Sequence, residues 1–325
     1  MKHPFLPALT LLLLPLSSFA DPAVTDVVAK QRYPWNGLVD ISCTASGIEA
    51  IGAAGLKFAV STVDPDSGNV SPVSHVQMLR NGTVSNDLSV YVNGNYRLVW
   101  DAFADLGEVV YSNMVVRVEV VERKVQLWAD GPYWAEMNVG AEEPEDYGLY
   151  FWWGGTVGYR REGSAWVASN GSSQNFSFGS GNAPTCGKDN VTLRSEGWIT
   201  ADGVLAPEHD AAHVHWGGAW RMPTISELNA LNSNCDWTIE TRNGVNGYVV
   251  RGRDDYEANS IFLPAAGYGY GTSLRDAEAL GRYWTSVPIY LGAAWHLFFY
   301  SGEHYTSDYN RYDGFPVRPV QGVVE

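Results

Sequence analysis

Residues 217–231 read Gly217-Gly218-Ala219-Trp220-Arg221-Met222-Pro223-Thr224-Ile225-Ser226-Glu227-Leu228-Asn229-Ala230-Leu231, a loop that runs into a helix. Thr224 and Glu227 have the spacing of a capping box. In that motif the threonine hydroxyl accepts a hydrogen bond from the backbone N–H of Glu227, and the glutamate accepts one from the backbone N–H of Thr224. Apolar residues then recur at helical spacing, at Ile225, Leu228 and Leu231. We therefore predict a short helix that starts after Thr224, buries one face and ends near Asn234.

The composition favours a folded, β-rich protein. The chain has 325 residues, of which 45% are hydrophobic and 18% are charged, and this length is typical of two domains. Its 34 glycines and 13 tryptophans favour a turn-rich, aromatic-rich β or α+β protein over a bundle of helices. The formal net charge of -15 argues against nucleic acid and anionic lipid as partners, because both attract lysine and arginine.

The first twenty residues have the pattern of an export signal. Lys2 and His3 give a weakly positive start, residues 5–16 are mainly apolar, and Ser17-Ser18-Phe19-Ala20 is a small-residue exit with expected cleavage after Ala20. The apolar run is too short to cross a membrane, and no later stretch is apolar enough to do so. We therefore expect residues 1–20 to be a signal peptide. The mature protein is expected to be exported from a bacterial cell and to be secreted, periplasmic or associated with the cell surface.

Residues 24 to about 121 show a β pattern. Short alternating or apolar segments are separated by turn residues such as Arg80-Asn81-Gly82 and Val92-Asn93-Gly94-Asn95. Short strands at this spacing predict an all-β sandwich of immunoglobulin-like type. The charged segment Val121-Glu122-Arg123-Lys124 is the expected joint, which gives a sandwich over residues 21–124 and a second domain over residues 125–325.

Several ordered blocks in the second domain carry a family resemblance. The first block spans residues 134–154 and includes Asn138-Val139-Gly140-Ala141, and the central block is Trp216-Gly217-Gly218-Ala219-Trp220-Arg221-Met222-Pro223-Thr224. Later blocks follow at residues 243–248, 259–268, 283–286 and 317–320. Together they resemble the Fibrobacter succinogenes major paralogous domain, over about residues 127–320. That family is similar to formylglycine-generating sulfatase-activating proteins, and the resemblance implies an α+β C-type-lectin-like fold.

The resemblance raises the possibility of an oxidase, which the residues argue against. Formylglycine-generating enzymes use a redox pair of cysteines near the C-terminus, whereas this chain has no cysteine after Cys235. Many related sequences read Val-Arg-Cys-Val where this one reads Val317-Arg318-Pro319-Val320, and proline forms no thiolate. We therefore expect no enzymatic activity. The expected structural residues of the central motif are Trp220, Arg221, Thr224 and Glu227.

Three histidines and two acidic runs are candidate metal ligands. His209, His213 and His215 follow one another closely, and a helix would place His209 and His213 on one face at zinc-capable spacing. We favour an exposed, solvated helix here, so no metal site is predicted. The runs 142–146 and 253–257 could hold calcium, but the second has the setting of a solvated hairpin tip and the sugar-binding motifs of calcium-dependent lectins are absent. Calcium stays open as the only cofactor.

The three cysteines give one packing prediction and one open pairing. Cys43 lies at an alternating apolar position, where we expect it to pack as a small hydrophobe. Cys186 and Cys235 fall in the same expected domain and could form a disulfide in an exported chain. Their spacing alone does not decide between pairing and free thiols.

The C-terminal strands hold the favoured site. Residues 294–300 predict a strand, and the segment 303–314 that follows combines tyrosines with serine, asparagine, aspartate and histidine. Tyrosine offers rigid amphipathic contact area and the short polar residues offer adaptable hydrogen bonds, as in binding loops. A solvated strand whose tyrosines pack on a neighbour is the alternative. The candidate ligand-binding residues are Trp295, His304, Tyr305, Asp308, Tyr309, Asn310, Tyr312 and Asp313, and Tyr268, Tyr270, Tyr283 and Tyr290 could extend the aromatic surface.

This tail also resembles the variable ends of lectin-like proteins diversified by retroelements. That resemblance implies that residues 304–313 are diversified positions. We expect an exported, non-enzymatic recognition protein that binds a glycan or a protein through this surface, and we expect the capped helix to support the sheet that carries it. A purely structural surface module is the alternative.

Overall fold

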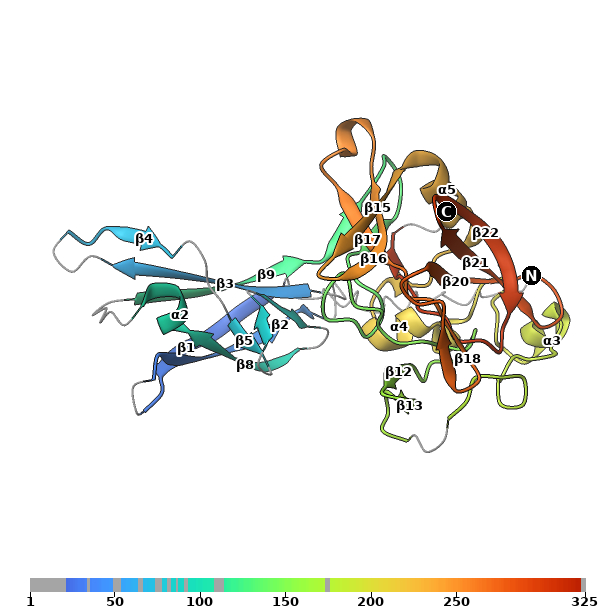
Figure 1. The fold of residues 1–325 in the computed structure, drawn as a ribbon, viewed down its shortest axis with the longest axis horizontal. Coiled ribbons are helices and arrows are strands. Elements are labelled where there is room, and N and C mark those ends of the chain that lie inside the picture. Colours follow the sequence, from blue (N-terminus) through green and yellow to red (C-terminus); the bar gives the residue numbers. More distant parts are fainter. Residues whose placement is uncertain are drawn as a thin grey trace, which may run out of the picture.

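The computed structural model describes residues 22–33, 36–48, 54–63, 67–73, 78–80, 83–85, 87–90, 93–107, 114–172 and 176–322 (Figure 1). The expected signal peptide, residues 1–20, lies outside these ranges. Of the described residues, 46% lie in strands and 13% in helices, which confirms the prediction of a β-rich protein. Within the described ranges, no helix has both the length and the apolar character needed to cross a membrane.

The first nine strands form two sheets that share one core. One sheet has the order β1 (Ala23–Gln31), β2 (Leu38–Ser46), β8 (Gly94–Asp101), β5 (Met78–Arg80), β6 (Thr83–Ser85). The other has the order β4 (Val70–Pro72), β3 (Ala54–Val63), β7 (Asp87–Val90), and β9 (Met114–Glu122) also pairs with β3. Ile41 and Trp100 of the first sheet pack with Leu56 and Phe58 of the second. Cys43 is buried in the same core, as predicted from its alternating position.

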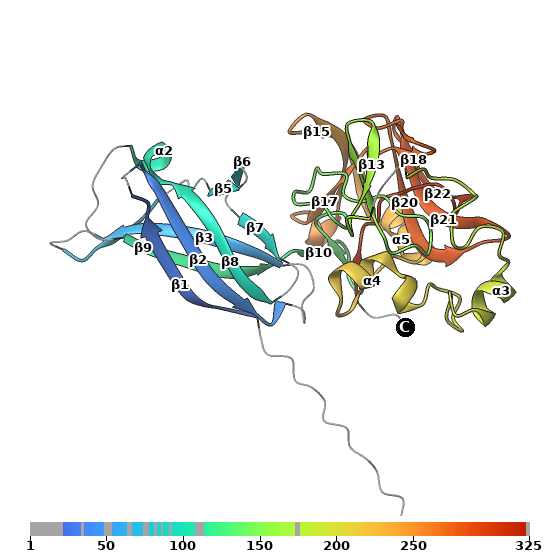
Figure 2. The same cartoon turned by 90° about the horizontal axis from the view of Figure 1, so that it is seen from below.

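The remaining strands form several small sheets, which Figures 1 and 2 show as a second body beside the first. A four-stranded sheet has the order β10 (Lys124–Gln126), β11 (Tyr133–Ala135), β23 (Val320–Gln321), β14 (Trp220–Arg221). Two three-stranded sheets comprise β15 (Asp236–Arg242), β16 (Val245–Arg251) and β17 (Ser260–Pro264), and β20 (Leu280–Pro288), β21 (Ala293–Tyr300) and β22 (Glu303–Asn310). Two hairpins are β12 (Tyr159–Glu162) with β13 (Ala165–Ala168), and β18 (Tyr268–Tyr270) with β19 (Ser273–Arg275).

The helices are short. In the first body α2 spans Ala102–Leu106, and in the second the α-helices are α3 (Asn190–Ser195), α4 (Ala211–Trp216) and α5 (Ile225–Asn234). Two 3-10 turns, η1 (Pro207–His209) and η2 (Asp254–Tyr256), also belong to the second body. Among the described residues, each strand pairing joins two members of β1–β9 or two members of β10–β23. The chain therefore changes from one set of sheets to the other at Arg123.

Helix α5 confirms the capped helix predicted from the sequence. The Thr224 side chain accepts from the backbone N–H of Glu227 at 3.2 Å, and Glu227 accepts from the backbone N–H of Thr224 at 2.8 Å. The Arg221 guanidinium also donates to both oxygens of Glu227, at 2.8 and 2.6 Å. Leu228 and Leu231 pack in the core cluster that includes residues of β20 and β21, so α5 supports this sheet as expected.

Two buried arginines hold the C-terminal segment through backbone carbonyls. The Arg318 guanidinium donates to the carbonyls of Ala135, Glu136 and Phe262. Arg311 donates in the same way to Ala293, Lys188 and Tyr290. Burial lowers the pKa of each guanidinium to about 10, and the carbonyl oxygens satisfy the buried charge. Arg318 therefore links the segment just before β23 to β11 and β17.

Candidate ligand-binding surface

The register of β21 and β22 divides the predicted binding residues between two faces of one sheet. Successive side chains of a strand point to opposite faces, and residues directly opposite one another across a pair share a face. Tyr305 lies opposite Phe298 and Tyr309 opposite Ala294, whereas His304 lies opposite Phe299 and Asp308 opposite Trp295. Tyr305 and Tyr309 therefore share one face. Trp295, His304 and Asp308 share the other, so the eight candidates do not form one surface.

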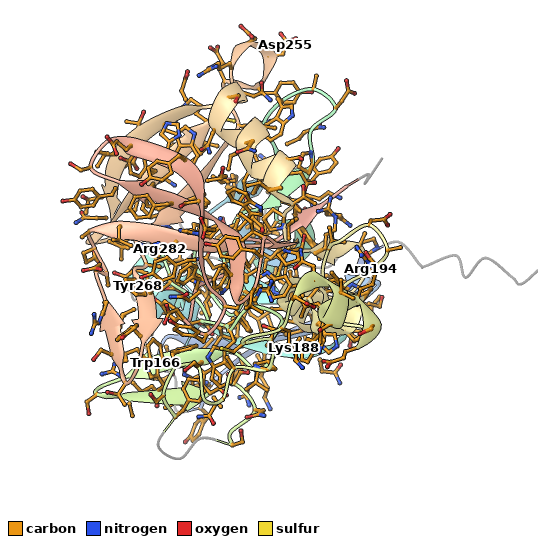
Figure 3. The ribbon with its side chains drawn as sticks, turned by 90° about the vertical axis from the view of Figure 1, so that its right-hand side faces the viewer. Trp166, Lys188, Arg194, Asp255, Tyr268 and Arg282 are labelled. Carbon is orange, nitrogen blue, oxygen red and sulfur yellow. The ribbon has the colours of Figure 1, made fainter. Side chains whose placement is uncertain are left out.

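The face of Tyr305 and Tyr309 is built around an arginine. We call it the tyrosine face and define it by Arg282, Phe298, Tyr305, Tyr309 and Tyr268. The Arg282 guanidinium carbon lies 4.3 Å from the ring centre of Tyr309, 4.8 Å from that of Phe298 and 5.2 Å from that of Tyr268. Figure 3 shows Arg282 beside Tyr268. These distances are typical of cation–π contacts, which fix the orientation of the rings.

Arg282 also contacts the buried ring of His296. Its Nη1 lies 3.0 Å from Nε2 of His296. Burial, together with the positive charge of Arg282, lowers the pKa of His296 to about 3, so the ring is neutral near pH 7 and accepts a hydrogen bond at Nε2. Burial also lowers the pKa of Arg282. The guanidinium is thus held beneath the aromatic rings by a neutral partner rather than by an acid.

Asp313 and Tyr312 follow the end of β22. Asp313 is only 1% exposed, and burial raises its pKa to about 6, although the charges of Arg282 and Arg275 act in the opposite direction. Such a side chain lies beneath the surface and offers little area to a ligand. Tyr312 is half-buried, and its backbone carbonyl accepts a hydrogen bond from Nε1 of Trp152 at 3.0 Å.

The opposite face of the sheet is occupied largely by contacts within the protein. The His304 ring stacks on Trp237 at 4.3 Å between ring centres, and its Nδ1 lies 3.0 Å from Oδ1 of Asn232 in α5. The Tyr290 hydroxyl donates to Asp308 at 2.6 Å. Asn310 is exposed, opposite Ala293. His304 is therefore positioned to join the sheet to α5 and β15.

The additional aromatic candidates differ in their surroundings. Tyr283 is 1% exposed and donates from its hydroxyl to the carbonyl of Pro264, so it is a core residue and does not extend the surface. Tyr270 is exposed, and the Arg275 guanidinium lies 4.1 Å from its ring centre. Arg282 and Phe298 are not among the site residues predicted from the sequence. Strict alternation along the two strands could have placed Phe298 with Tyr305, but nothing in the local sequence of β20 marks Arg282.

The three histidines do not converge. The His209 ring stacks on Trp198 at 3.9 Å, while Nδ1 of His213 lies 3.3 Å from the Trp220 carbonyl and Nε2 of His215 lies 2.8 Å from the Thr156 carbonyl. The expected helix is present, as η1 and α4, but its description as a solvated helix is wrong. Ala211, Ala212 and Trp216 of α4 are buried, because the helix packs into the core of this body.

The acidic runs and cysteines have simple roles in the described part of the chain. The Asp146 carboxylate accepts hydrogen bonds from the backbone N–H groups of Glu142 and Glu143, both at 3.0 Å. The run 253–257 lies between the paired strands β16 and β17, which confirms the predicted hairpin tip. Across the described residues, no three His, Cys, Asp or Glu side chains gather into a metal site. All three cysteines are free thiols, so Cys186 and Cys235 do not pair in this structure.

The thiol of Cys235 is poorly suited to redox chemistry. It is buried at the end of α5, and burial raises its pKa to about 12. A thiol in this state is protonated near pH 7 and is a weak nucleophile.

Comparison of the chain with protein-family models, curated proteins and solved structures found no match in any of the three.

Proposed function

We propose that this chain is an exported, non-enzymatic recognition protein that binds a protein ligand through the tyrosine face. In this proposal the body that starts near Lys124 is a C-type-lectin-like domain of the Fibrobacter major paralogous type. The body before it is an immunoglobulin-like sandwich. The fold assignments rest on the ordered motif blocks and on the two sets of sheets.

The composition and order of the tyrosine face carry the proposal. Tyrosine and arginine dominate the binding energy of protein interfaces, whereas most other contacts contribute little. Tyr305 is 46% exposed, and Arg282 holds the neighbouring Tyr309 and Phe298 rings in fixed positions. A ligand therefore meets aromatic groups that are already ordered, which reduces the entropy lost on binding. The face lies on a three-stranded sheet, and such a surface suits a protein epitope.

Within this proposal, diversification is expected to affect ligand binding at only some of residues 304–310. Among residues 304–310 of β22, alternation gives Tyr305, Ser307 and Tyr309 to the tyrosine face. Variation at these three positions would change the ligand, while variation at His304 would disturb the packing on Trp237. Genome sequence decides the matter. The hypothesis fails if the neighbourhood lacks both a near-copy template repeat and a reverse-transcriptase gene.

Binding of labelled protein to whole bacterial cells and to their extracellular matrix tests the function. We expect Tyr305→Ala and Tyr309→Ala each to weaken binding at least about tenfold, which corresponds to about 1.4 kcal/mol. Asn310→Ala is the matched control, because Asn310 is exposed in the same strand but on the other face. Protease treatment of the cells should abolish binding. Unchanged binding by both tyrosine variants would favour a purely structural module.

Two further outcomes distinguish the alternatives. Binding that survives protease but not glycosidase treatment would identify a glycan as the ligand of the tyrosine face. Formation of an aldehyde in a cysteine-containing sulfatase peptide would show an oxidase. The raised pKa of Cys235 supports the expectation that no aldehyde forms.

A further inference from the structure

Two hollows on the second body lie along helix α5 and share one residue, Trp128. The larger has a volume of about 500 Å³ and the smaller a volume of about 350 Å³. Trp128 lines both, and we call the two hollows together the α5 groove. Volumes of this size are typical of small-molecule sites.

One wall of the groove is a single side of α5. Ser226 and Ala230 line the larger hollow and Asn234 lines the smaller. These residues are spaced four apart, so they lie on one side of the helix and extend for about 12 Å at 1.5 Å per residue. Leu228 and Leu231 point to a different side and pack beneath the β20–β21–β22 sheet. The groove is therefore separate from the tyrosine face, and Figure 3 shows Asp255 of the groove well away from Tyr268 and Arg282.

The other wall includes the aromatic side chains of Trp128 and Tyr133. Trp128 is half-buried and packs on Trp134 at 6.4 Å between ring centres. Gly131 lies against the Trp128 ring so closely that a Cβ there would approach ring atoms to 2.5 Å, which leaves no space for any side chain. Tyr133 is 39% exposed, and Nζ of Lys124 lies 4.9 Å from its ring centre. Both aromatic rings are therefore fixed in orientation while part of each remains accessible.

The charged groups of the groove are mainly acidic. Asp130 lies in the larger hollow, and Asp254 and Asp255 lie in the smaller. Arg253 is the basic residue of the smaller hollow, but its guanidinium is held by Asp236 and by the carbonyls of Ser233 and Cys235. Carboxylates repel an anionic ligand and accept hydrogen bonds from hydroxyl groups, including two hydroxyls on adjacent carbon atoms.

We propose that the α5 groove is a second ligand site, which binds a neutral oligosaccharide. The C–H groups of a pyranose ring pack on the accessible surfaces of Trp128 and Tyr133, since an aromatic ring presents a negative face to them. The hydroxyl groups of the sugar donate to Asp130, Asp254 and Asp255. The two hollows follow α5 over about 12 Å, which suits a short chain of sugars rather than one ring, and the acidic groups select against uronic acids and sulfated sugars.

Calorimetric titration of the full chain tests this site. The probes are cellotetraose, maltotetraose, xylotetraose and mannotetraose, with tetragalacturonate as the acidic counterpart. We expect saturable binding of at least one neutral probe with a Kd below about 1 mM, a change in tryptophan fluorescence and no binding of tetragalacturonate. Failure of all four neutral probes to bind, or tighter binding of tetragalacturonate, would overturn the proposal.

Variants locate the binding site. Tyr133→Ala removes a ring that is partly exposed, and Ala230→Trp fills the larger hollow from the helix. Each should weaken binding of the neutral probe at least tenfold while the unfolding transition stays close to that of the wild type. Tyr305→Ala on the tyrosine face is the control and should leave saccharide binding unchanged. Saccharide binding that survives both groove variants, or is lost in Tyr305→Ala, would place it elsewhere and refute the proposal.

Discussion

Asp313 and His296 lie near the same guanidinium, that of Arg282, and burial shifts their pKa values in opposite directions. The pKa of Asp313 rises from an ordinary value of 3.8 to about 6, so the folded protein holds this proton more tightly than the unfolded chain. Its contribution to stability therefore declines as the pH rises from about 4 to 6. The pKa of His296 falls from 6.5 to about 3, so its contribution is lost as the pH falls through that range. In the wild type the two effects oppose one another.

The variant Asp313→Asn should separate these effects. At pH 7 it removes a buried negative charge, and we expect the free energy of unfolding to rise by up to about 3 kcal/mol, since one pKa unit corresponds to about 1.4 kcal/mol. Between pH 6.5 and 4.5 His296 is then unopposed, so stability should fall more steeply than in the wild type. Urea denaturation at several pH values measures both quantities. A profile parallel to that of the wild type would contradict the raised pKa of Asp313.

His304 gives a second prediction at the scale of a residue. Its stacking on Trp237 and its contact with Asn232 join β22 to β15 and α5. His304→Ala removes both contacts, and we expect a loss of about 1–2 kcal/mol in the free energy of unfolding. Because the side chain lies on the face opposite Tyr305, ligand binding should stay unchanged. Reduced binding by a folded His304→Ala protein would show that both faces take part.

At the scale of elements, the cap of α5 is the clearest source of local stability. Thr224→Ala removes one hydrogen bond to the backbone and should lower the free energy of unfolding by about 1 kcal/mol. Arg221→Met should cost more, about 2 kcal/mol, because the half-buried Glu227 then loses both of its guanidinium donors. Urea denaturation measures both variants. Glu240→Gln, which breaks the more exposed Arg242–Glu240 pair, should cost less than about 0.5 kcal/mol. Equal losses of unfolding free energy for the Arg221–Glu227 and Arg242–Glu240 pairs would show that the burial of Glu227 does not strengthen its ion pair.

The same elements show how far the sequence predicts this molecule. The capped helix, the hairpin tip at 253–257 and the strand at 294–300 follow from local patterns that tertiary packing does not override. The prediction of one aromatic surface over residues 304–313 is wrong. It rested on their composition, whereas successive residues of a strand lie on opposite faces of the sheet. Arg282 belongs to another strand, and only the pairing of β20 with β21 brings it under Tyr309. Tyrosine is often found at binding surfaces, but the side chain of Tyr283 is buried in the core.

At the scale of the whole molecule, Arg123 lies where the two sets of sheets meet. It is 6% exposed, and its Nη1 lies 3.8 Å from Sδ of Met137 and 3.7 Å from a carboxylate oxygen of Glu136. A Cβ on Gly55 of β3 would approach its Nε to 2.8 Å, so the same guanidinium also touches the first set of sheets. Arg123 is therefore a contact between the two bodies. Its Glu136 and Met137 partners both belong to the second.

The second body should fold without the first. Its opening strands β10 and β11 join its last strand β23 in one sheet, and Arg318 links Ala135 and Glu136 to the C-terminal segment, so its own two ends are tied together. We expect residues 121–325, which retain Arg123, to show a cooperative urea transition and the near-ultraviolet circular dichroism of ordered tryptophans. Binding at the tyrosine face should persist, because β20, β21 and β22 belong wholly to this body. A fragment that lacks a cooperative transition would mean that the first body supplies part of the core. Gly55→Ala in the full chain is the matched variant. The added Cβ displaces the Arg123 guanidinium from the first body, whereas Glu136 and Met137, which contact Arg123 in the second body, are unchanged.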